Sequence, residues 1–473
     1  MDIQVSSNFE RFLFHLLDDD AEQVKSLMKT FEETGRFQVC ENTLKKARDI
    51  VFSVAVSDGE TLKTIKKYYE SSNYILCPHS AVGVKAAHVY LKSEGSNHNN
   101  TLICLATAHY GKFNDTIQKA LKYSPPLPNR LDTLRWKRFK KFECGNSLPE
   151  FKHFIENHIN NLAVHDEGLF APFTIKVPCT TANLGCGFDS FGLALDMHLI
   201  VHVAPLPGDA KFEIVVTGEE SDLPTDESNL IWRVANSVVS HYQKALPPLK
   251  ITINNPIPLS RGLGSSACAV VTGVLIANCL GDLNLNTNEL LAHMCKIEGH
   301  PDNITPALVG GFTSSASFDD PENQGFPKVI FTNNAVHPAI KAIIFVPNYK
   351  LDTEESRSVL PSTYSRRDTV HNLQRIGLLI SGMASARADL VSLGMDDKIH
   401  QPYRAPLIPG LNSVLSLSGK LDGMLGVCIS GSGSTIIAFV THNIDAITAA
   451  VTFHLGPVNV KVLSISHSGS LIE

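Results

Sequence analysis

One segment near the middle of the chain constrains the fold more than any other. Residues 258–268 read PLSRGLGSSAC and run directly into the apolar stretch 267–280. That stretch is shorter than the ~20 uninterrupted apolar residues of a membrane span, so it predicts a buried helix. Gly262 and Gly264, just before it, let the backbone approach a ligand without a Cβ in the way. The sequence therefore predicts a loop that leads into the N-terminus of a buried helix.

This loop has the properties of a phosphate site. Consecutive amide N–H groups at a helix N-terminus, together with the helix dipole, attract phosphate oxygens. The segment has neither the Gly-Lys-Ser/Thr of a Walker loop nor the glycine spacing of a Rossmann loop, and a glycine- and serine-rich cap without a function is the alternative. The candidate phosphate-binding residues are Pro258, Leu259, Ser260, Arg261, Gly262, Leu263, Gly264, Ser265, Ser266 and Ala267.

Composition and charge narrow the class of protein. The 473 residues suffice for about three domain-sized units. The net charge of −6 gives no electrostatic case for a nucleic acid or an anionic membrane as partner. The ten cysteines form no C-x-x-C pair, which favours reduced thiols over a disulfide framework or a zinc site. No secretory signal opens the sequence, so we expect a cytoplasmic protein.

The first part of the chain, residues 1–142, shows helical patterns followed by short apolar runs. We expect strands at 74–77 and 101–106, and strands that alternate with helices indicate an α/β fold. The basic stretch 130–141 is interrupted by apolar residues and is interpreted as a solvated helix with one packed side. The polar stretch 143–171 is interpreted as a linker, partly helical.

From residue 172 onward, predicted strands precede predicted helices, and strands then return. This order favours an α+β domain of two layers. We expect strands at 173–177, 199–204, 212–217, 250–254, 343–346, 426–430 and 436–440. We expect helices at 265–280, 288–297 and 370–386.

Three motifs in this second part carry a family resemblance. PLSRGLGSSAC resembles the central motif of the GHMP kinases, named after galacto-, homoserine, mevalonate and phosphomevalonate kinases. Residues 177–196, VPCTTANLGCGFDSFGLALD, resemble the first motif of that family, and residues 426–439, GVCISGSGSTIIAF, resemble its glycine-rich last motif. Three motifs in the right order are hard to obtain by chance. The resemblance implies a two-layer GHMP kinase fold, with an ATP-binding half at 172–340 and a C-terminal half at 341–473.

Further motifs resemble the homoserine kinases within that family. They are EGHPDNITPALVGGF (298–312), LDTEESRSVLP (351–361) and HQPYRAPLIPG (400–410), so the resemblance covers about residues 172–470. It implies the Mg²⁺- and ATP-dependent phosphorylation of L-homoserine to O-phospho-L-homoserine in threonine biosynthesis. By analogy with the family we also expect a homodimer.

The resemblance also implies roles for charged side chains. Homoserine is a zwitterion, and its carboxylate is best bound by the fork of an arginine. Arg357 and Arg404 occupy the positions that the family uses for this purpose. Asp189 is the candidate partner of the substrate ammonium. Each of these residues alone also has an ordinary structural interpretation, as a surface arginine or a turn aspartate.

The remaining candidates surround the reacting groups. The resemblance implies that Asn183 and His300 hold the substrate near its hydroxyl and that Thr353 lies near the substrate and the γ-phosphate. It gives Asn183 and Thr353 the catalytic roles and no residue the role of general base.

Two further predictions concern the Mg²⁺ ion and the nucleotide. Ser266 and Glu298 are the candidate ligands of Mg²⁺, and Asn229 is a candidate for the adenine side of the nucleotide.

The first part of the chain resembles a different family. Residues 2–14, 57–69, 77–87 and 104–113 look like the C-terminal part of threonine synthase, an enzyme of the fold type II pyridoxal-phosphate (PLP) architecture. That family's Schiff-base lysine lies in a preceding part, so we do not expect PLP to bind this chain. The segment is either a remnant or the tail of a bifunctional threonine synthase/homoserine kinase.

Other functions stay open. A GHMP kinase for another small alcohol, such as mevalonate, is the second enzymatic interpretation. A regulatory protein that has kept the folds without catalysis is the third, and a PLP-dependent lyase ranks last.

Overall fold

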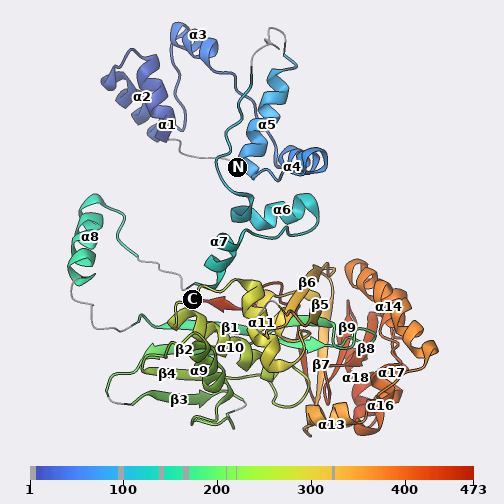
Figure 1. The fold of residues 1–473 in the computed structure, drawn as a ribbon. Helices are drawn as coiled ribbons and strands as arrows, with labels where there is room; N and C mark the ends of the chain where they lie inside the picture. The colour runs from blue at the N-terminus through green and yellow to red at the C-terminus, as the bar shows by residue number, and fades with distance from the viewer. Residues whose placement is uncertain are drawn as a thin grey trace. The chain divides into compact units, whose positions relative to one another are not determined.

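The computed structural model describes residues 7–93, 101–137, 143–162, 170–208, 210–219, 221–321 and 325–473. The chain forms two compact units, Met1–Pro128 and Asn129–Glu473 (Figure 1). Each unit has its own hydrophobic core, and the two are described separately.

The described residues of the first unit form helices and no strand. The helices are α1 (Ser7–Leu16), α2 (Ala21–Thr34), α3 (Glu41–Ile50), α4 (Asp58–Ser72), α5 (Pro78–Tyr90), η1 (Tyr110–Phe113) and α6 (Asn114–Leu121). Helix α4 begins with a capping box, in which Ser57 and Glu60 satisfy each other's backbone N–H groups. A small core holds α4, α5 and α6 together and contains Ile65, Val84 and Ile117.

The expected α/β fold of the first unit is therefore wrong for its described residues. Residues 74–77 and 101–106 are not strands, although both are apolar. A strand forms only where a neighbour takes up its N–H and C=O groups, and the described part of this unit offers none. The side chains of Ile103 and Leu105 are correspondingly 81% and 75% exposed.

The second unit begins earlier in the chain than the sequence suggests. Helix α7 (Asn129–Asp132) and the turn η2 (Thr133–Trp136) belong to it, although we grouped these residues with the first unit. Trp136 is 2% exposed, and its Nε1 donates a hydrogen bond to Thr287 Oγ1 at 3.0 Å. We expected the basic stretch 130–141 to pack through its apolar residues, and Trp136 is the buried one. The expected boundary at residue 142 lies outside the described residues, and α8 (Leu148–Leu162) lies in the expected linker.

Two β-sheets form the second unit. The strands are β1 (Phe173–Ala182), β2 (Phe191–Pro205), β3 (Phe212–Thr217), β4 (Leu249–Asn254), β5 (Phe312–Phe318), β6 (Lys328–Asn334), β7 (Lys341–Pro347), β8 (Met424–Ile429), β9 (Ile436–Val440), β10 (Val458–Leu463) and β11 (Leu471–Ile472). The larger sheet has the order β11-β1-β2-β4-β3, and β5 pairs with both β2 and β6. Its pairs are antiparallel except β3–β4, which is parallel. The smaller sheet is antiparallel, with the order β10-β7-β9-β8.

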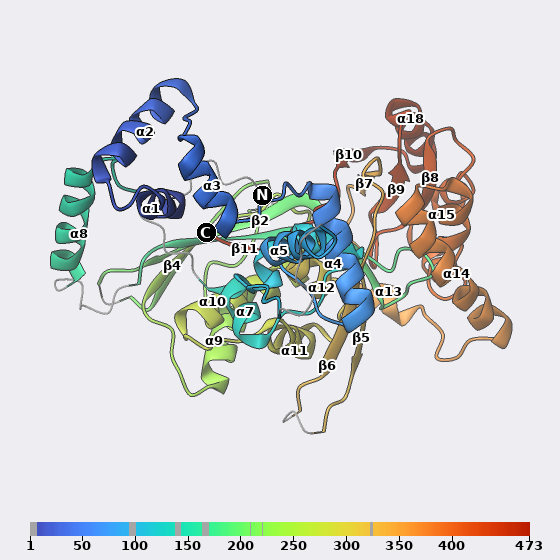
Figure 2. The same ribbon diagram turned by 90° about the horizontal axis from the view of Figure 1, so that it is seen from above.

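Helices cover these sheets. They are α9 (Leu230–His241), α10 (Ser265–Leu280), α11 (Thr287–Glu298), α12 (Ile304–Val309), α13 (Thr353–Ser358), α14 (Arg366–Ser385), α15 (Ala388–Gly394), α16 (Gln401–Arg404), η3 (Ala405–Leu407), α17 (Leu411–Leu415) and α18 (Ile444–Leu455). Helices α9, α10 and α11 lie on one face of the larger sheet, whereas α14, α15 and α18 group with the smaller sheet (Figures 1 and 2). The expected two-layer α+β architecture is thus confirmed for this unit.

Strand β7 contributes side chains to two hydrophobic cores, one on each of its faces. Successive side chains of β7 point to opposite faces, because the period of a strand is two. Ile344 packs into a large core that also contains α10, and Ile343 and Phe345 pack into a second core with α17 and α18. Helix α10 is buried on almost every side, as its largely apolar sequence predicts.

Among the described residues, no helix is both long and apolar enough to cross a bilayer. All ten cysteines are free thiols.

Candidate active site

A cleft of about 380 Å³ in the second unit brings together most of the predicted site residues. It is lined by the loop 258–266, by Ala269 in the helix that follows, and by residues from six other segments. The predicted residues among them are Asn183, Asp189, Glu298, His300, Thr353, Arg357 and Arg404. A larger hollow of about 590 Å³ lies beside Trp232 and Arg233, but neither the loop nor the two predicted substrate arginines line it. We therefore place the site in the smaller cleft.

The loop presents an open helix N-terminus to this cleft. Gly264, the N-cap of α10, has φ +69° and offers no side chain to the first N–H groups of the helix. Serine, threonine, aspartate or asparagine at this position would cap those groups. Gly262 has φ +75°, and a Cβ there would overlap with the carbonyl oxygen of Ser430. The glycines therefore leave the first N–H groups of α10 available to an anion.

Ser266 and Glu298 meet at the edge of this loop. The Ser266 hydroxyl donates a hydrogen bond to Glu298 Oε2 at 3.1 Å. Burial raises the pKa of Glu298 above its usual value, while His300 and the bond from Ser266 oppose the shift. A hydroxyl and a carboxylate oxygen are hard ligands of the kind that Mg²⁺ prefers. The two side chains therefore fit the binding of one such ion.

Asp189 and Arg357 form an ion pair with each other. Arg357 donates from Nη2 to Asp189 Oδ1 at 2.7 Å and from Nη1 to Oδ2 at 3.1 Å. The side chains of both residues remain about one third exposed, at 37% and 33%. From the sequence we expected Arg357 to bind the carboxylate of the substrate and Asp189 to bind its ammonium. Without a ligand, they neutralise each other.

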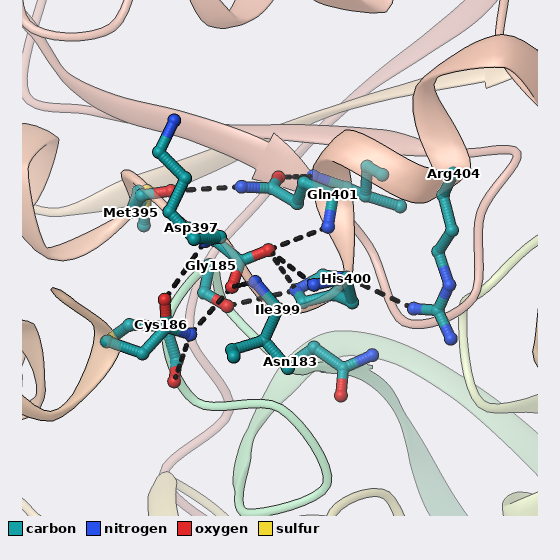
Figure 3. Close-up of polar contacts among 12 residues, drawn as sticks. Asn183, Gly185, Cys186, Met395, Asp397, Ile399, His400, Gln401 and Arg404 are labelled. Atoms are coloured by element: carbon teal, nitrogen blue, oxygen red, sulfur yellow. Dashed lines mark hydrogen bonds and ion pairs between the residues drawn. The ribbon is translucent and has the colours of Figure 1, made fainter. Parts of the chain in front are cut away.

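Arg404 lies deeper, at the end of α16. It is 1% exposed, and it donates from Nε to Ser356 O at 3.2 Å and from Nη1 to Gly431 O at 3.1 Å. Burial and the neighbouring Arg357 lower the pKa of Arg404 to about 10, so the side chain is still a cation at neutral pH. Among the described residues, none is recorded as an acceptor for Nη2. Figure 3 shows the contact of this side chain with His400.

His300 is held by a buried carboxylate. Asp302, 1% exposed, lies 2.5 Å from His300 Nδ1 through its Oδ1. Burial disfavours the charged imidazole, but the bond to Asp302 and the charges of Asp302 and Asp189 outweigh it and raise the pKa of His300. The three side chains Asp189, His300 and Asp302 form one polar cluster on the wall of the cleft.

Backbone strain marks the turn after β1. Asn183 has φ +70° and Asp189 has φ +52°, a region that asparagine and aspartate tolerate better than other side chains. Asn183 accepts a hydrogen bond from the Asp189 N–H at 2.9 Å and donates to Gly431 O at 2.8 Å. Both ends of the Asn183 amide therefore take part in hydrogen bonds that hold the turn carrying Asp189.

Thr353 is the first residue of α13. Its Oγ1 lies 3.4 Å from Ser432 Oγ, on the glycine-rich turn between β8 and β9. It is exposed to solvent and is one of the residues that line the cleft.

Two predicted nucleotide residues do not line the cleft. Ala267 is fully buried in the first turn of α10. Asn229 caps α9: its Oδ1 accepts from the Ile231 N–H at 3.0 Å, and its Nδ2 donates to Pro224 O at 2.7 Å. Leu230, the next residue, lines the cleft in its place.

Three lining residues with charged or amide side chains escaped the sequence prediction. Asp302 and Asn303 belong to the EGHPDN motif, where only the glutamate and the histidine received roles, and Lys350 directly precedes LDTEESR. The Thr180 hydroxyl donates to Asn303 Oδ1 at 2.8 Å and so fixes the orientation of that amide. These three residues could have been predicted to line the site because they are polar and stand next to motif residues that had received roles.

Family models match both parts of the chain. The model "GHMP kinases N terminal domain" matches residues 229–311, and "GHMP kinases C terminal" matches residues 371–455. The model "Threonine synthase, C-terminal" matches residues 80–155. That last match continues past residue 142 into the expected linker.

Curated relatives and solved structures agree with these matches. The chain is 40% identical to a homoserine kinase of Clostridium novyi over 267 residues, which are 56% of this chain and 86% of the relative. It is 37% identical to a homoserine kinase of Microchaete diplosiphon over 303 residues, which are 63% and 96% of the two chains. The crystal structure of homoserine kinase from Cytophaga hutchinsonii covers 64% of this chain and 98% of its own, with 26% identity and a TM-score of 0.55. The chain belongs to the homoserine kinase family of GHMP kinases, and it carries an N-terminal segment similar to the C-terminal part of threonine synthase.

Proposed function

We propose that the chain phosphorylates L-homoserine with ATP. One observation carries the proposal: an open helix N-terminus, two arginines and an aspartate line a single cleft. The helix N-terminus suits a phosphate chain, the arginines suit a carboxylate, and the aspartate suits an ammonium group. Family membership supplies the rest, since the relatives are homoserine kinases at 37–40% identity.

The loop 258–266 binds the triphosphate through its backbone. The N–H groups of Ser265 and Ser266 face the cleft without a capping side chain, so phosphate oxygens complete their hydrogen bonding. Ser266 and Glu298 would hold Mg²⁺, which would offset negative charge on the phosphate groups.

The charged side chains orient the amino acid. The substrate carboxylate binds the free side of the Arg404 fork and Arg357, and the substrate ammonium binds Asp189. The ion pair between Asp189 and Arg357 opens for this purpose, and the two charges of the zwitterion replace the two that separate. An alcohol without the ammonium would leave Asp189 to compete for Arg357, which disfavours mevalonate as a substrate.

Transfer of the phosphoryl group then depends mainly on position and charge. The substrate hydroxyl oxygen forms a bond to the γ-phosphorus while the bond to the β–γ bridging oxygen breaks. Asn183, His300 and Thr353 lie on the walls around the reacting groups and restrict the hydroxyl to this direction. We assign no general base, and the hydroxyl proton leaves to phosphate or solvent.

The experiment that tests this proposal is a substrate panel. The purified chain is given Mg²⁺ and ATP with L-homoserine, L-serine, L-threonine or mevalonate, and ADP release and the phosphorylated product are measured. We expect O-phospho-L-homoserine to be the main product and to disappear when Mg²⁺ is chelated. A higher kcat/KM for mevalonate, or no turnover of homoserine, would contradict the proposal.

The homodimer, the cytoplasmic location and the lack of PLP binding stay predictions. So does the choice between a remnant and a bifunctional enzyme for the first unit.

A further inference from the structure

His400, a residue without an assigned role, lies directly behind Arg404. It is fully buried, and its Nδ1 lies 3.2 Å from Arg404 Nη1 (Figure 3). Its other ring nitrogen, Nε2, lies 2.9 Å from Gly185 O. A guanidinium only donates and a carbonyl only accepts, so the ring must accept at Nδ1 and donate at Nε2. His400 is therefore the neutral Nε2–H tautomer.

The electrostatics of the site agree with this tautomer. Burial and the adjacent Arg404 lower the pKa of His400, against the opposing effect of Asp397. The carboxylate of Asp397 lies 3.6 Å from Nε2, farther than the Gly185 oxygen, and is occupied by backbone N–H groups. It accepts from the N–H groups of His400 at 2.9 Å and Gln401 at 2.6 Å, and it thereby anchors the first turn of α16.

The two contacts of His400 join two different substrate-binding elements. Arg404, on α16, is the proposed partner of the carboxylate. Gly185 lies in the strained turn 183–190, which presents Asp189, the proposed partner of the ammonium. One imidazole ring thus spans the distance between the group for the carboxylate and the turn for the ammonium.

Phe188 packs against His400 and lies close to both arginines. Its ring stacks on the His400 ring, with 5.4 Å between centroids and 22° between planes. The guanidinium carbons of Arg404 and Arg357 lie 5.4 and 5.7 Å from the Phe188 centroid. The aromatic ring attracts both cations. Arg404, which lines the cleft, is therefore held both by His400 and by Phe188.

From this arrangement we infer that His400 is a positioning residue for substrate selection. It sets the distance between Arg404 and the turn that carries Asp189, and so favours substrates whose carboxylate and ammonium sit on the same carbon. The inference rests on the proposed function.

Two amide variants break the two contacts of His400 one at a time. In His400→Asn, the amide oxygen takes the place of Nδ1 and still accepts from Arg404. In His400→Gln, the amide takes the place of Nε2 and retains only the contact with Gly185. Both variants remove the ring and leave a neutral amide in the same cavity, so their costs in stability should be similar.

The readout is the KM for homoserine at saturating ATP and Mg²⁺. We expect both variants to raise this KM, because each breaks one of the two contacts that set the spacing: His400→Gln about tenfold, through the loss of one charge-assisted hydrogen bond, and His400→Asn about threefold, through the loss of the bond to the Gly185 carbonyl. The KM for ATP should stay near the wild-type value in both. No rise of the homoserine KM in one of the variants, or a rise of the ATP KM as large as that of the homoserine KM, would overturn the inference.

A wild-type measurement remains decisive if the variants fail to fold. The isomer 3-amino-4-hydroxybutanoate moves the ammonium one carbon away from the carboxylate. We expect its kcat/KM to be at least about tenfold below that of homoserine. Equal kcat/KM values would refute selection by spacing while leaving the kinase activity intact, whereas wild-type protein inactive on homoserine would refute the proposed function itself.

Discussion

Replacing Arg404 by lysine tests the substrate site most directly, because it keeps the charge and removes the fork. The guanidinium donates to Ser356 O, Gly431 O and His400 Nδ1 while it is 1% exposed. A single ammonium nitrogen cannot reach all three acceptors. At least one buried acceptor loses its donor, which costs about 1–3 kcal/mol of stability.

The same substitution weakens the binding of homoserine. The lysine no longer presents a planar N–H group at the position of Nη2, so the substrate carboxylate loses a charge-assisted hydrogen bond. A loss of about 2 kcal/mol corresponds to a KM for homoserine that is ~30-fold higher. The hydrogen bonds of Arg404 in the described part of the chain go to Ser356, His400 and Gly431 and not to the loop 258–266, so the KM for ATP should stay within about twofold of the wild-type value.

A coupled assay of ADP release, with homoserine titrated at saturating Mg²⁺ and ATP, measures both constants. Arg357→Lys is the matched control, because Arg357 is 37% exposed and its loss should leave the melting temperature almost unchanged. We expect Arg357→Lys to raise the homoserine KM without the fall of a few degrees in melting temperature that Arg404→Lys causes. A homoserine KM within twofold of wild type in Arg404→Lys, in folded protein, would refute the assignment of the carboxylate to Arg404.

Three further predictions concern other parts of the second unit. Glu298→Gln should raise the Mg²⁺ concentration for half-maximal activity about tenfold or more at fixed ATP, and an unchanged requirement would remove Glu298 from the metal site. Gly262→Ala should abolish most activity, because its Cβ overlaps with the Ser430 carbonyl and φ is +75°; normal ATP binding by calorimetry would contradict this. Burial lowers the pKa of His293 to about 4, so below pH ~6.5 the unfolded chain binds a proton that the folded chain excludes. Stability lost between pH 7 and pH 5 should therefore be about 2 kcal/mol smaller in His293→Gln than in wild type, by thermal unfolding at both values, and equal losses would speak against a neutral buried His293.

Much of the kinase unit was predictable because its signals are local. The apolar stretch after Gly264 forms α10 from Ser265 to Leu280, as expected, since an apolar helix without a polar face has to be buried. The predicted strands at 173–177, 250–254 and 436–440 lie within β1, β4 and β9. Strands β5 and β6 escaped prediction: Ala316 and Phe318, near the end of β5, are exposed, and Ile330 in β6 is 55% exposed, so neither shows a clear apolar face.

The candidate site was predictable to a lesser degree. Motif resemblance pointed to Asp189, Arg357 and Arg404, and the structure places all three in one cleft. Asn229 shows the limit of such reasoning. Its preceding residues DES and its following apolar run suit a helix cap as well as a nucleotide contact, and its contacts in the structure are those of a cap.

The sequence by itself determined the elements whose causes lie within a few residues: the glycine loop, the buried helix behind it, and the periodic strands of the kinase unit. Only the tertiary structure decided the interactions between residues far apart in the chain. It paired Asp189 with Arg357, placed His400 between Arg404 and Gly185, and left residues 101–106 without a neighbouring strand. Hydrogen bonds and strand pairs need two partners, and a sequence pattern specifies only one of them.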